Sequence, residues 1–272
     1  PAYDSWVSLD PFSRQKEYFL SVGLQSGMSV SDLRRPPLNL VVVLDISGSM
    51  SSPFQEYYYD RFGNRLQGRG QDEPIKQKME VAKDALVALT RELRPADRLG
   101  IVVFNNQGLV AKPLNPVAET DIQAIRGHIR QDLRPMGGTN MSAGMMAGTE
   151  LFAGVERTGR ENRILFMTDA MPNMGVTGQS RLADLFEKNA NRGIHTTFVG
   201  MGVDFNTALV EALTKVRGAN TYSVHNAQEF KEKLSEGLEY MLFPLVFDLR
   251  LRLRAEGFAL EKVYGSPEAE EA

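Results

Sequence analysis

Residues 41–49 constrain the fold and the chemistry of this chain more than any other stretch. They begin with an apolar run that is typical of a strand buried on both faces, as in a parallel sheet covered by helices. The run stops at Asp45, and Ser47 and Ser49 follow on either side of Gly48. In an open α/β sheet, ligands bind outside the carboxyl ends of the strands. One carboxylate and two hydroxyls at that point predict a site for a hard cation such as Mg²⁺.

Strand-like and helix-like segments alternate through the middle of the chain. Short apolar runs predict buried strands, and longer segments with apolar residues at helical spacing predict helices between them. The expected strands are 40–44, 99–104, 164–167, 195–199 and 221–224, and the expected helices are 76–93, 122–133, 142–155, 181–190, 206–216 and 228–242. This alternation predicts an α/β fold, a doubly wound and mostly parallel central sheet with helices on both faces.

Two flanks and one insertion depart from the alternation. Residues 1–36 contain a strand-like segment, and residues 244–265 include a stretch of alternating apolar and charged residues that is typical of a half-buried antiparallel strand. We expect these flanks to pair as a small β appendage beside the main domain, 37–243, and to be followed by an acidic tail at 266–272. The insertion at 51–78 is rich in Tyr, Arg and Gly, and is interpreted either as a surface insert or as a ligand-contacting loop.

Composition and motifs exclude several classes of function. The net charge of −3 offers no basic excess for phosphates, so no nucleic-acid partner is expected. No apolar run reaches the roughly 18 residues that span a bilayer, so no direct membrane insertion is expected. Cys is absent, which excludes disulfides and thiolate metal ligands. The chain has no phosphate loop and no G-x-S-x-G elbow, and its three His lack the paired spacing of a zinc site.

Two further loops carry oxygen ligands that the predicted topology brings to the same sheet edge as Asp45. A Gly-Gly-Thr-Asn stretch at 137–140 precedes a helix, and its glycines allow a close backbone approach. A Met-Thr-Asp stretch at 167–169 ends a buried strand. Thr139 can therefore supply a third hydroxyl and Asp169 a second carboxylate. If the two serines only capped a turn and a helix, these two residues would be unexplained.

Together, the Asp-x-Ser-x-Ser, Gly-Gly-Thr-Asn and Thr-Asp motifs resemble those of the von Willebrand factor type A (vWA) domain, whose Rossmann-like fold carries a metal-ion-dependent adhesion site (MIDAS). The resemblance covers roughly residues 37–242. It implies that three hydroxyls reach the metal directly and that two carboxylates hold it largely through water, namely Ser47, Ser49 and Thr139, and Asp45 and Asp169. The implied ion is Mg²⁺, or else Mn²⁺ or Ca²⁺, with one position open for a carboxylate.

The resemblance implies a divalent-metal-dependent protein-binding or adhesion module without enzymatic activity, whose protein ligand presents an Asp or Glu side chain. The residues expected to form a partner-selecting rim are Tyr57, Tyr58, Tyr59, Arg61, Gly138, Asn140 and Asn173. One alternative is a scaffold or regulatory subunit working with a AAA+ ATPase or a chelatase-type complex. A less favoured one is a phosphatase-like enzyme using Asp45, because Ser47 stands where such enzymes have a second Asp. An extracellular, cell-surface or periplasmic location is favoured over a cytoplasmic one, and the oligomeric state stays open.

Overall fold

The chain forms two compact units, Pro1–Arg35 and Pro36–Ala272, in a computed structural model. The residues that the structure describes are 2–24, 35–54, 57–59, 65–67, 76–169, 172–202, 207–224, 233, 238–243, 247, 251–253, 256–259, 261 and 263.

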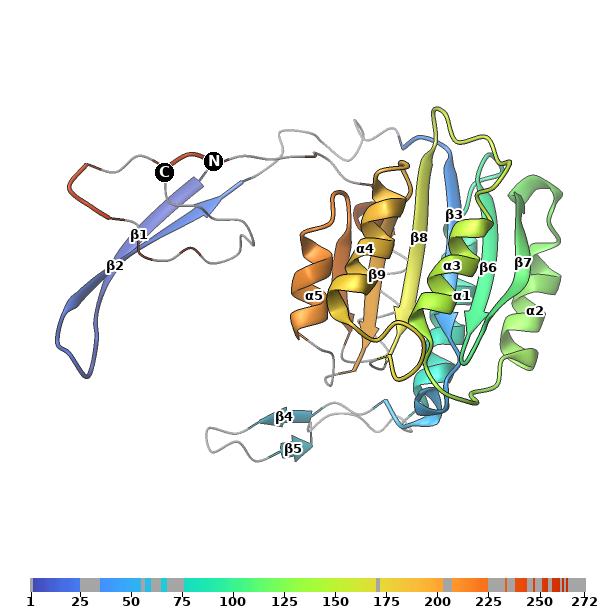
Figure 1. The fold of residues 1–272 in the computed structure, drawn as a ribbon, viewed down its shortest axis with the longest axis horizontal. Coiled ribbons are helices and arrows are strands. Elements are labelled where there is room, and N and C mark those ends of the chain that lie inside the picture. The colour runs from blue at the N-terminus through green and yellow to red at the C-terminus, as the bar shows by residue number, and fades with distance from the viewer. Residues whose placement is uncertain are drawn as a thin grey trace. The chain divides into compact units, whose positions relative to one another are not determined.

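The larger unit is built on a six-stranded sheet with the order β10-β9-β8-β3-β6-β7 (Figure 1). Its strands are β3 (Leu38–Asp45), β6 (Arg98–Phe104), β7 (Gly108–Pro116), β8 (Glu161–Thr168), β9 (His195–Met201) and β10 (Asn220–Val224). Five strands are parallel, and β7 alone pairs antiparallel, with β6, at the sheet edge. The prediction of a mostly parallel sheet in an α/β fold is confirmed.

Helices cover both faces of this sheet, as the doubly wound prediction requires. Figure 1 shows α3, α4 and α5 in front of the sheet and α1 behind it. The helices on one face are α1 (Lys78–Glu92), α2 (Ile122–Asp132) and α7 (Leu238–Leu242), and those on the other are α3 (Met141–Glu150), α4 (Gln179–Ala190) and α5 (Thr207–Thr214).

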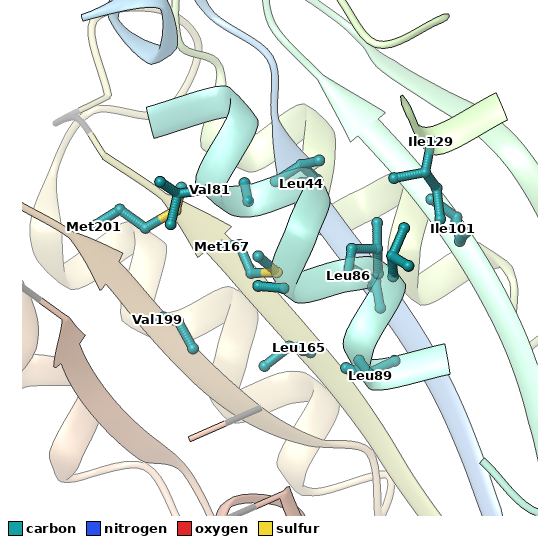
Figure 2. Packing of buried hydrophobic residues seen from close by; sticks show 14 of the residues in the cluster. Leu44, Val81, Leu86, Leu89, Ile101, Ile129, Leu165, Met167, Val199 and Met201 are labelled. Carbon is teal, nitrogen blue, oxygen red and sulfur yellow. The ribbon is translucent and has the colours of Figure 1, made fainter. Parts of the chain in front are cut away.

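The central strand β3 shows why helices are needed on both faces of the sheet, because all eight of its residues are buried. Leu40, Val42 and Leu44 belong to the apolar cluster that includes α1, whereas Val41 and Val43 belong to the cluster that includes α3. Figure 2 shows Leu44 among the residues of the first cluster. Full burial of each such side chain contributes about 1.5–3 kcal/mol. The strand is therefore anchored from both sides, and the position of its carboxyl end is well defined.

Two elements differ from the sequence-based expectations. The edge strand β7 is not predicted by the pattern, because two Pro and one Asn weaken its β-propensity and only Lys112 and Leu114 are buried. The helix expected at 142–155 ends as α3 at Glu150, where Leu151 takes the C-cap position and turns follow. Of the helix expected at 228–242, the structure describes α7 and residue 233, and the remainder lies outside the described residues.

The smaller unit is an antiparallel hairpin of β1 (Ala2–Leu9) and β2 (Lys16–Gly23), in register from Ala2 opposite Gly23 to Leu9 opposite Lys16. In the C-terminal flank, the described residues 251–253 are not in a strand, and most of 244–265 and all of the tail 266–272 lie outside the described part of the chain. The pairing of the two flanks as one β appendage therefore stays a prediction.

The insertion at 51–78 contains a short antiparallel pair, β4 (Tyr57–Tyr59) and β5 (Arg65–Gln67). Its other residues between 55 and 75 lie outside the described residues. Across the part of the chain that the structure describes, every helix falls short of the length and apolarity needed to cross a membrane.

Candidate metal site

The candidate site lies at the carboxyl edge of the sheet. Because β3, β6, β8 and β9 are parallel, their carboxyl ends share this edge. Asp45 ends β3, Asn105 follows β6, Asp169 follows β8 and Gly202 follows β9. Polar residues that are far apart in the sequence are thus brought together at the edge where α/β sheets bind ligands.

Asp45 is a fully buried carboxylate that neutral groups hold in place. The backbone N–H of Ser47 donates to its Oδ1 at 2.7 Å, and the hydroxyl of Thr168 donates to its Oδ2 at 2.5 Å. Burial raises the pKa of Asp45 to about 6, although the hydrogen bonds from Thr168 and Ser47 oppose the rise, and the nearby carboxylate of Asp169 adds to it. A buried carboxylate of this kind is suited to binding a cation, whose positive charge stabilises the ionised form.

The two predicted serines and the second predicted carboxylate form one hydrogen-bonded chain. The Oγ atoms of Ser47 and Ser49 are 3.0 Å apart, and the Ser49 hydroxyl donates to Oδ1 of Asp169 at 2.8 Å. The other oxygen of Asp169, Oδ2, accepts from the ammonium of Lys78 at 2.8 Å. The structure therefore brings four of the five predicted ligands into one cluster with a lysine on its border.

The loop that carries Thr139 lies directly against the serine loop. The N–H of Gly48 donates to the carbonyl of Gly137 at 3.0 Å, two residues before Thr139. Thr139 itself is buried, and its N–H donates to Oδ1 of Asn173 at 2.8 Å. Its carbonyl accepts from the N–H groups of Asn173 and Met174. The fifth predicted ligand is thus held on a loop that both neighbouring loops fix in place.

Several residues that support the site were not predicted as site residues. Oδ1 of Asn106 accepts from the N–H of Gly138 at 2.6 Å, and the carbonyl of Asn105 accepts from the N–H of Asn140 at 2.7 Å. The sequence carries a signal for both, because the Asn-Asn pair directly follows the apolar strand 99–104 and so lies at the same edge. Thr168 and Lys78 also contact the predicted ligands. Thr168 stands directly before Asp169 in the Thr-Asp motif, whereas Lys78 has no comparable signal.

The predicted rim residues on this loop have structural roles. Oδ1 of Asn140 accepts from the N–H of Ala143 at 3.1 Å and from the Ser142 hydroxyl at 2.8 Å, so this side chain caps α3. Asn173 is exposed and holds Thr139, as described above, and Gly138 is half-buried. Partner contact by these residues stays a prediction.

The rim residues expected on the insertion are described only in part. The backbones of Tyr57, Tyr58 and Tyr59 form β4, while nothing is described of their side chains, and Arg61 lies outside the described residues.

The donor set fits a hard divalent cation in kind, because it consists of carboxylate and hydroxyl oxygens. Asp45 and Asp169 are both buried and supply negative charge. The described residues contain no group of three or more His, Cys, Asp or Glu that could hold a metal. A metal at this edge would therefore depend on the hydroxyls of Ser47, Ser49 and Thr139 as well as on the two acids.

Comparison with known proteins shows which domain family the central part of the chain is similar to. Residues 40–172, just under half of the chain, match the family model of the von Willebrand factor type A domain. Inter-alpha-trypsin inhibitor heavy chain H1 from Mesocricetus auratus is 23% identical over 221 residues, which cover 79% of this chain and 21% of that protein. The chain spans between 20% and 34% of the length of the curated relatives it matches.

Solved structures agree in fold. A variant of the PilB minor pilin from Streptococcus sanguinis superposes with a TM-score of 0.59 at 12% identity, covering 88% of this chain and 74% of that one. Proximal thread matrix protein 1 from the mussel byssus, in a structure with a zinc-occupied MIDAS motif, superposes with a TM-score of 0.54 at 17% identity, covering 75% of this chain and 48% of that one. At such identities these likenesses show the fold alone, which is the vWA fold.

Proposed function

We propose that this chain is a divalent-metal-dependent protein-binding module in which an acidic side chain of a partner protein completes the coordination of Mg²⁺, or of Mn²⁺ or Ca²⁺. The residues proposed to hold the ion are Asp45, Ser47, Ser49, Thr139 and Asp169. The observation that carries the proposal is the hydrogen-bonded cluster at the carboxyl edge of the sheet, in which the backbone N–H of Ser47 donates to Asp45 and the hydroxyls of Ser47 and Ser49 lead to Asp169.

Each protein group has a distinct part in this proposal. Asp45 and Asp169 supply the negative charge, and their burial keeps water from screening it. The hydroxyls of Ser47, Ser49 and Thr139 are neutral, so they leave the charge of a cation incompletely balanced. A bound divalent ion would supply the positive charge that attracts a partner's carboxylate. Selectivity for an acidic partner follows from this charge balance.

The orientation of the donor groups comes from residues that surround them. Thr168 holds one oxygen of Asp45 from the neighbouring strand. Asn106 and Asn173 hold the backbone of the loop that carries Thr139. These groups orient metal ligands without touching the metal. Their removal usually lowers metal affinity by roughly 10- to 100-fold.

A binding role is favoured over the phosphatase-like alternative. Both oxygens of Asp45 accept hydrogen bonds, and the side chain has no exposed surface, so it is poorly placed to attack a phosphate ester. The scaffold alternative, with a AAA+ ATPase or a chelatase-type complex, would use the same site and differs in the partner. An extracellular, cell-surface or periplasmic location is part of the proposal.

Calorimetry on the metal-free protein tests the metal site. After dialysis against EDTA, Mg²⁺ is titrated into the parent, into Asp45→Asn and into Asp132→Asn. Asp132 is a matched control because it is an exposed carboxylate on α2. The parent and the control are expected to bind one ion per chain, and Asp45→Asn to bind at least about tenfold more weakly. Equal heats in the parent and in Asp45→Asn would refute the site.

A peptide pair tests the partner chemistry. A peptide with a single central Glu is compared with its Gln counterpart by fluorescence anisotropy, in Mg²⁺ and in EDTA. Binding is expected only for the Glu peptide in Mg²⁺. Equal binding of both peptides, or binding that EDTA leaves unchanged, would contradict the role of the carboxylate.

A further inference from the structure

Lys78 places an ammonium group against the candidate metal site. Its Nζ donates to Oδ2 of Asp169 at 2.8 Å, in a pair whose side chains are only 15% and 0% exposed. The backbone N–H of Lys78 donates to the carbonyl of Ser52 at 3.0 Å, which ties the start of α1 to the end of the serine loop. The lysine is therefore held at this position by both its backbone and its side chain.

Helix stability does not explain a lysine here. Lys78 is the first residue of α1, where the helix dipole disfavours a positive charge. The preceding residue, Gln77, makes no capping hydrogen bond with its side chain that could compensate. By contrast, Lys76 pairs with Asp84 on the surface, where both side chains are about half exposed and such pairs contribute little. The buried carboxylate of Asp169 is the feature that accounts for a cation at position 78.

The end of β9 lies beside the lysine side chain. Gly202, at the end of β9, has a φ of +109°, and a β-carbon added there would lie 3.4 Å from Nζ and 3.5 Å from Cε of Lys78. The lysine side chain therefore runs along the end of β9 to reach the residue that follows β8. Its ammonium lies on the border of the oxygen cluster, and it shares the carboxylate of Asp169 with the hydroxyl of Ser49.

We propose that Lys78 is a built-in counter-ion of this site, which neutralises Asp169 when no metal is bound and competes with a divalent cation for that carboxylate. The inference rests on the proposed metal site. A divalent ion among these oxygens would repel an ammonium bonded to the same carboxylate, because like charges close together in a partly buried site interact strongly. Metal binding then requires the ammonium to leave Oδ2 of Asp169, and the affinity for metal is lower than the oxygens alone would give.

Removal of the charge gives the first test. Lys78→Gln is compared with the parent and with Lys76→Gln, which removes an equal charge from an exposed pair two residues earlier. Calorimetric titration with Mg²⁺ is expected to show binding about fivefold tighter or more in Lys78→Gln, and within about twofold of the parent in Lys76→Gln. Thermal unfolding followed by circular dichroism establishes that each variant is folded.

The outcomes separate this inference from the metal site itself. If the parent binds Mg²⁺ and Asp45→Asn does not, while Lys78→Gln binds equally or more weakly than the parent, the counter-ion role is overturned and the metal site stands. Weaker binding would show instead that the lysine positions Asp169 for the metal. If the parent and Asp45→Asn give the same heats, the metal site fails and the counter-ion role fails with it.

A second readout needs no variant. The metal-free parent is treated briefly with an acetylating N-hydroxysuccinimide ester, with and without Mg²⁺, and the modification of each lysine is measured by peptide mass spectrometry. Lys78 is expected to be acetylated slowly without metal and faster with it, because the ammonium is released from Asp169. Lys76 serves as the internal control and is expected to be unchanged. An unchanged or slower reaction of Lys78 in Mg²⁺ would overturn the inference.

Discussion

The hydroxyl of Thr168 donates a hydrogen bond to Oδ2 of Asp45, and so joins the last residue of β8 to the last residue of β3. Both residues are fully buried. This contact aligns the carboxyl ends of two neighbouring strands and fixes the direction of a carboxylate that burial alone would leave costly to ionise. Much of the expected behaviour of the candidate site depends on it.

Thr168→Val is expected to destabilise the metal-free protein by about 1–3 kcal/mol, because a buried carboxylate loses a hydrogen-bond donor. Thr196→Val is the matched control. Thr196 is buried on β9, and its Oγ1 is a buried polar atom without a partner among the described residues, so its replacement by an apolar group of similar shape is expected to be neutral or stabilising. Urea unfolding of both variants makes the comparison, and an equal loss of stability in the two would contradict the role of the Thr168 bond.

Stability of the metal-free protein is expected to depend on the ionisation of Asp45. Burial raises its pKa from 3.8 to about 6, so between these values the folded state holds a proton that the unfolded chain has lost. The free energy of unfolding should therefore fall as pH rises through this window, by about 3 kcal/mol, which corresponds to roughly two pKa units. Unfolding in EDTA at several pH values measures it. Asp45→Asn should lack this contribution, and an equal slope in the parent and the variant would contradict the assignment to Asp45.

Gly175→Ala is expected to disturb the loop that supports Thr139. Gly175 has a φ of +68°, and a β-carbon there would clash with Oδ1 of Asn140, the cap of α3. Gly159→Ala is the control, because Gly159 has the same φ with nothing within 4 Å. In the control, only the added backbone strain should lower the free energy of unfolding, by about 1–2 kcal/mol. Gly175→Ala should lower the free energy of unfolding by more than this and should also bind Mg²⁺ more weakly. Unfolding and calorimetry together test this, and equal behaviour of the two variants would count against it.

Asn106→Ala is expected to weaken Mg²⁺ binding about tenfold, because Oδ1 of Asn106 holds the backbone of Gly138 next to Thr139. Stability should change by no more than about 1 kcal/mol, since Asn106 is exposed. Gln107→Ala, at the next exposed position, is the control. Calorimetry and urea unfolding give the two quantities, and unchanged Mg²⁺ affinity in Asn106→Ala would show that this loop needs no such support.

The sequence predicts the sheet and most of the candidate site because both depend on local patterns. An apolar run that ends in Asp45 indicates a buried strand and its carboxyl end, and the parallel topology then brings Asp169 to the same edge. The hydrogen bond between Ser49 and Asp169 is a direct consequence.

What the sequence does not predict depends on side-chain placement between distant segments. Lys78 lies 91 positions before Asp169, and the usual pattern favours acids over lysines in the first turn of a helix. Only the three-dimensional position of the buried carboxylate explains it. The role of Thr168 is also hard to predict from the sequence, because a threonine at the end of a strand is common. Its hydrogen bond to Asp45 can be expected only once β3 is known to be the neighbouring strand.

The central claim is that five side chains at one sheet edge hold a divalent cation, and an anomalous diffraction measurement tests it most directly. Crystals grown with MnCl₂ and measured near the manganese edge are expected to show a single strong peak roughly 2.0–2.3 Å from the hydroxyl oxygens of Ser47, Ser49 and Thr139. The ammonium of Lys78 should then have moved away from Asp169. A fully refined map with no peak at this edge, or with the ion bound by other residues, would contradict the account.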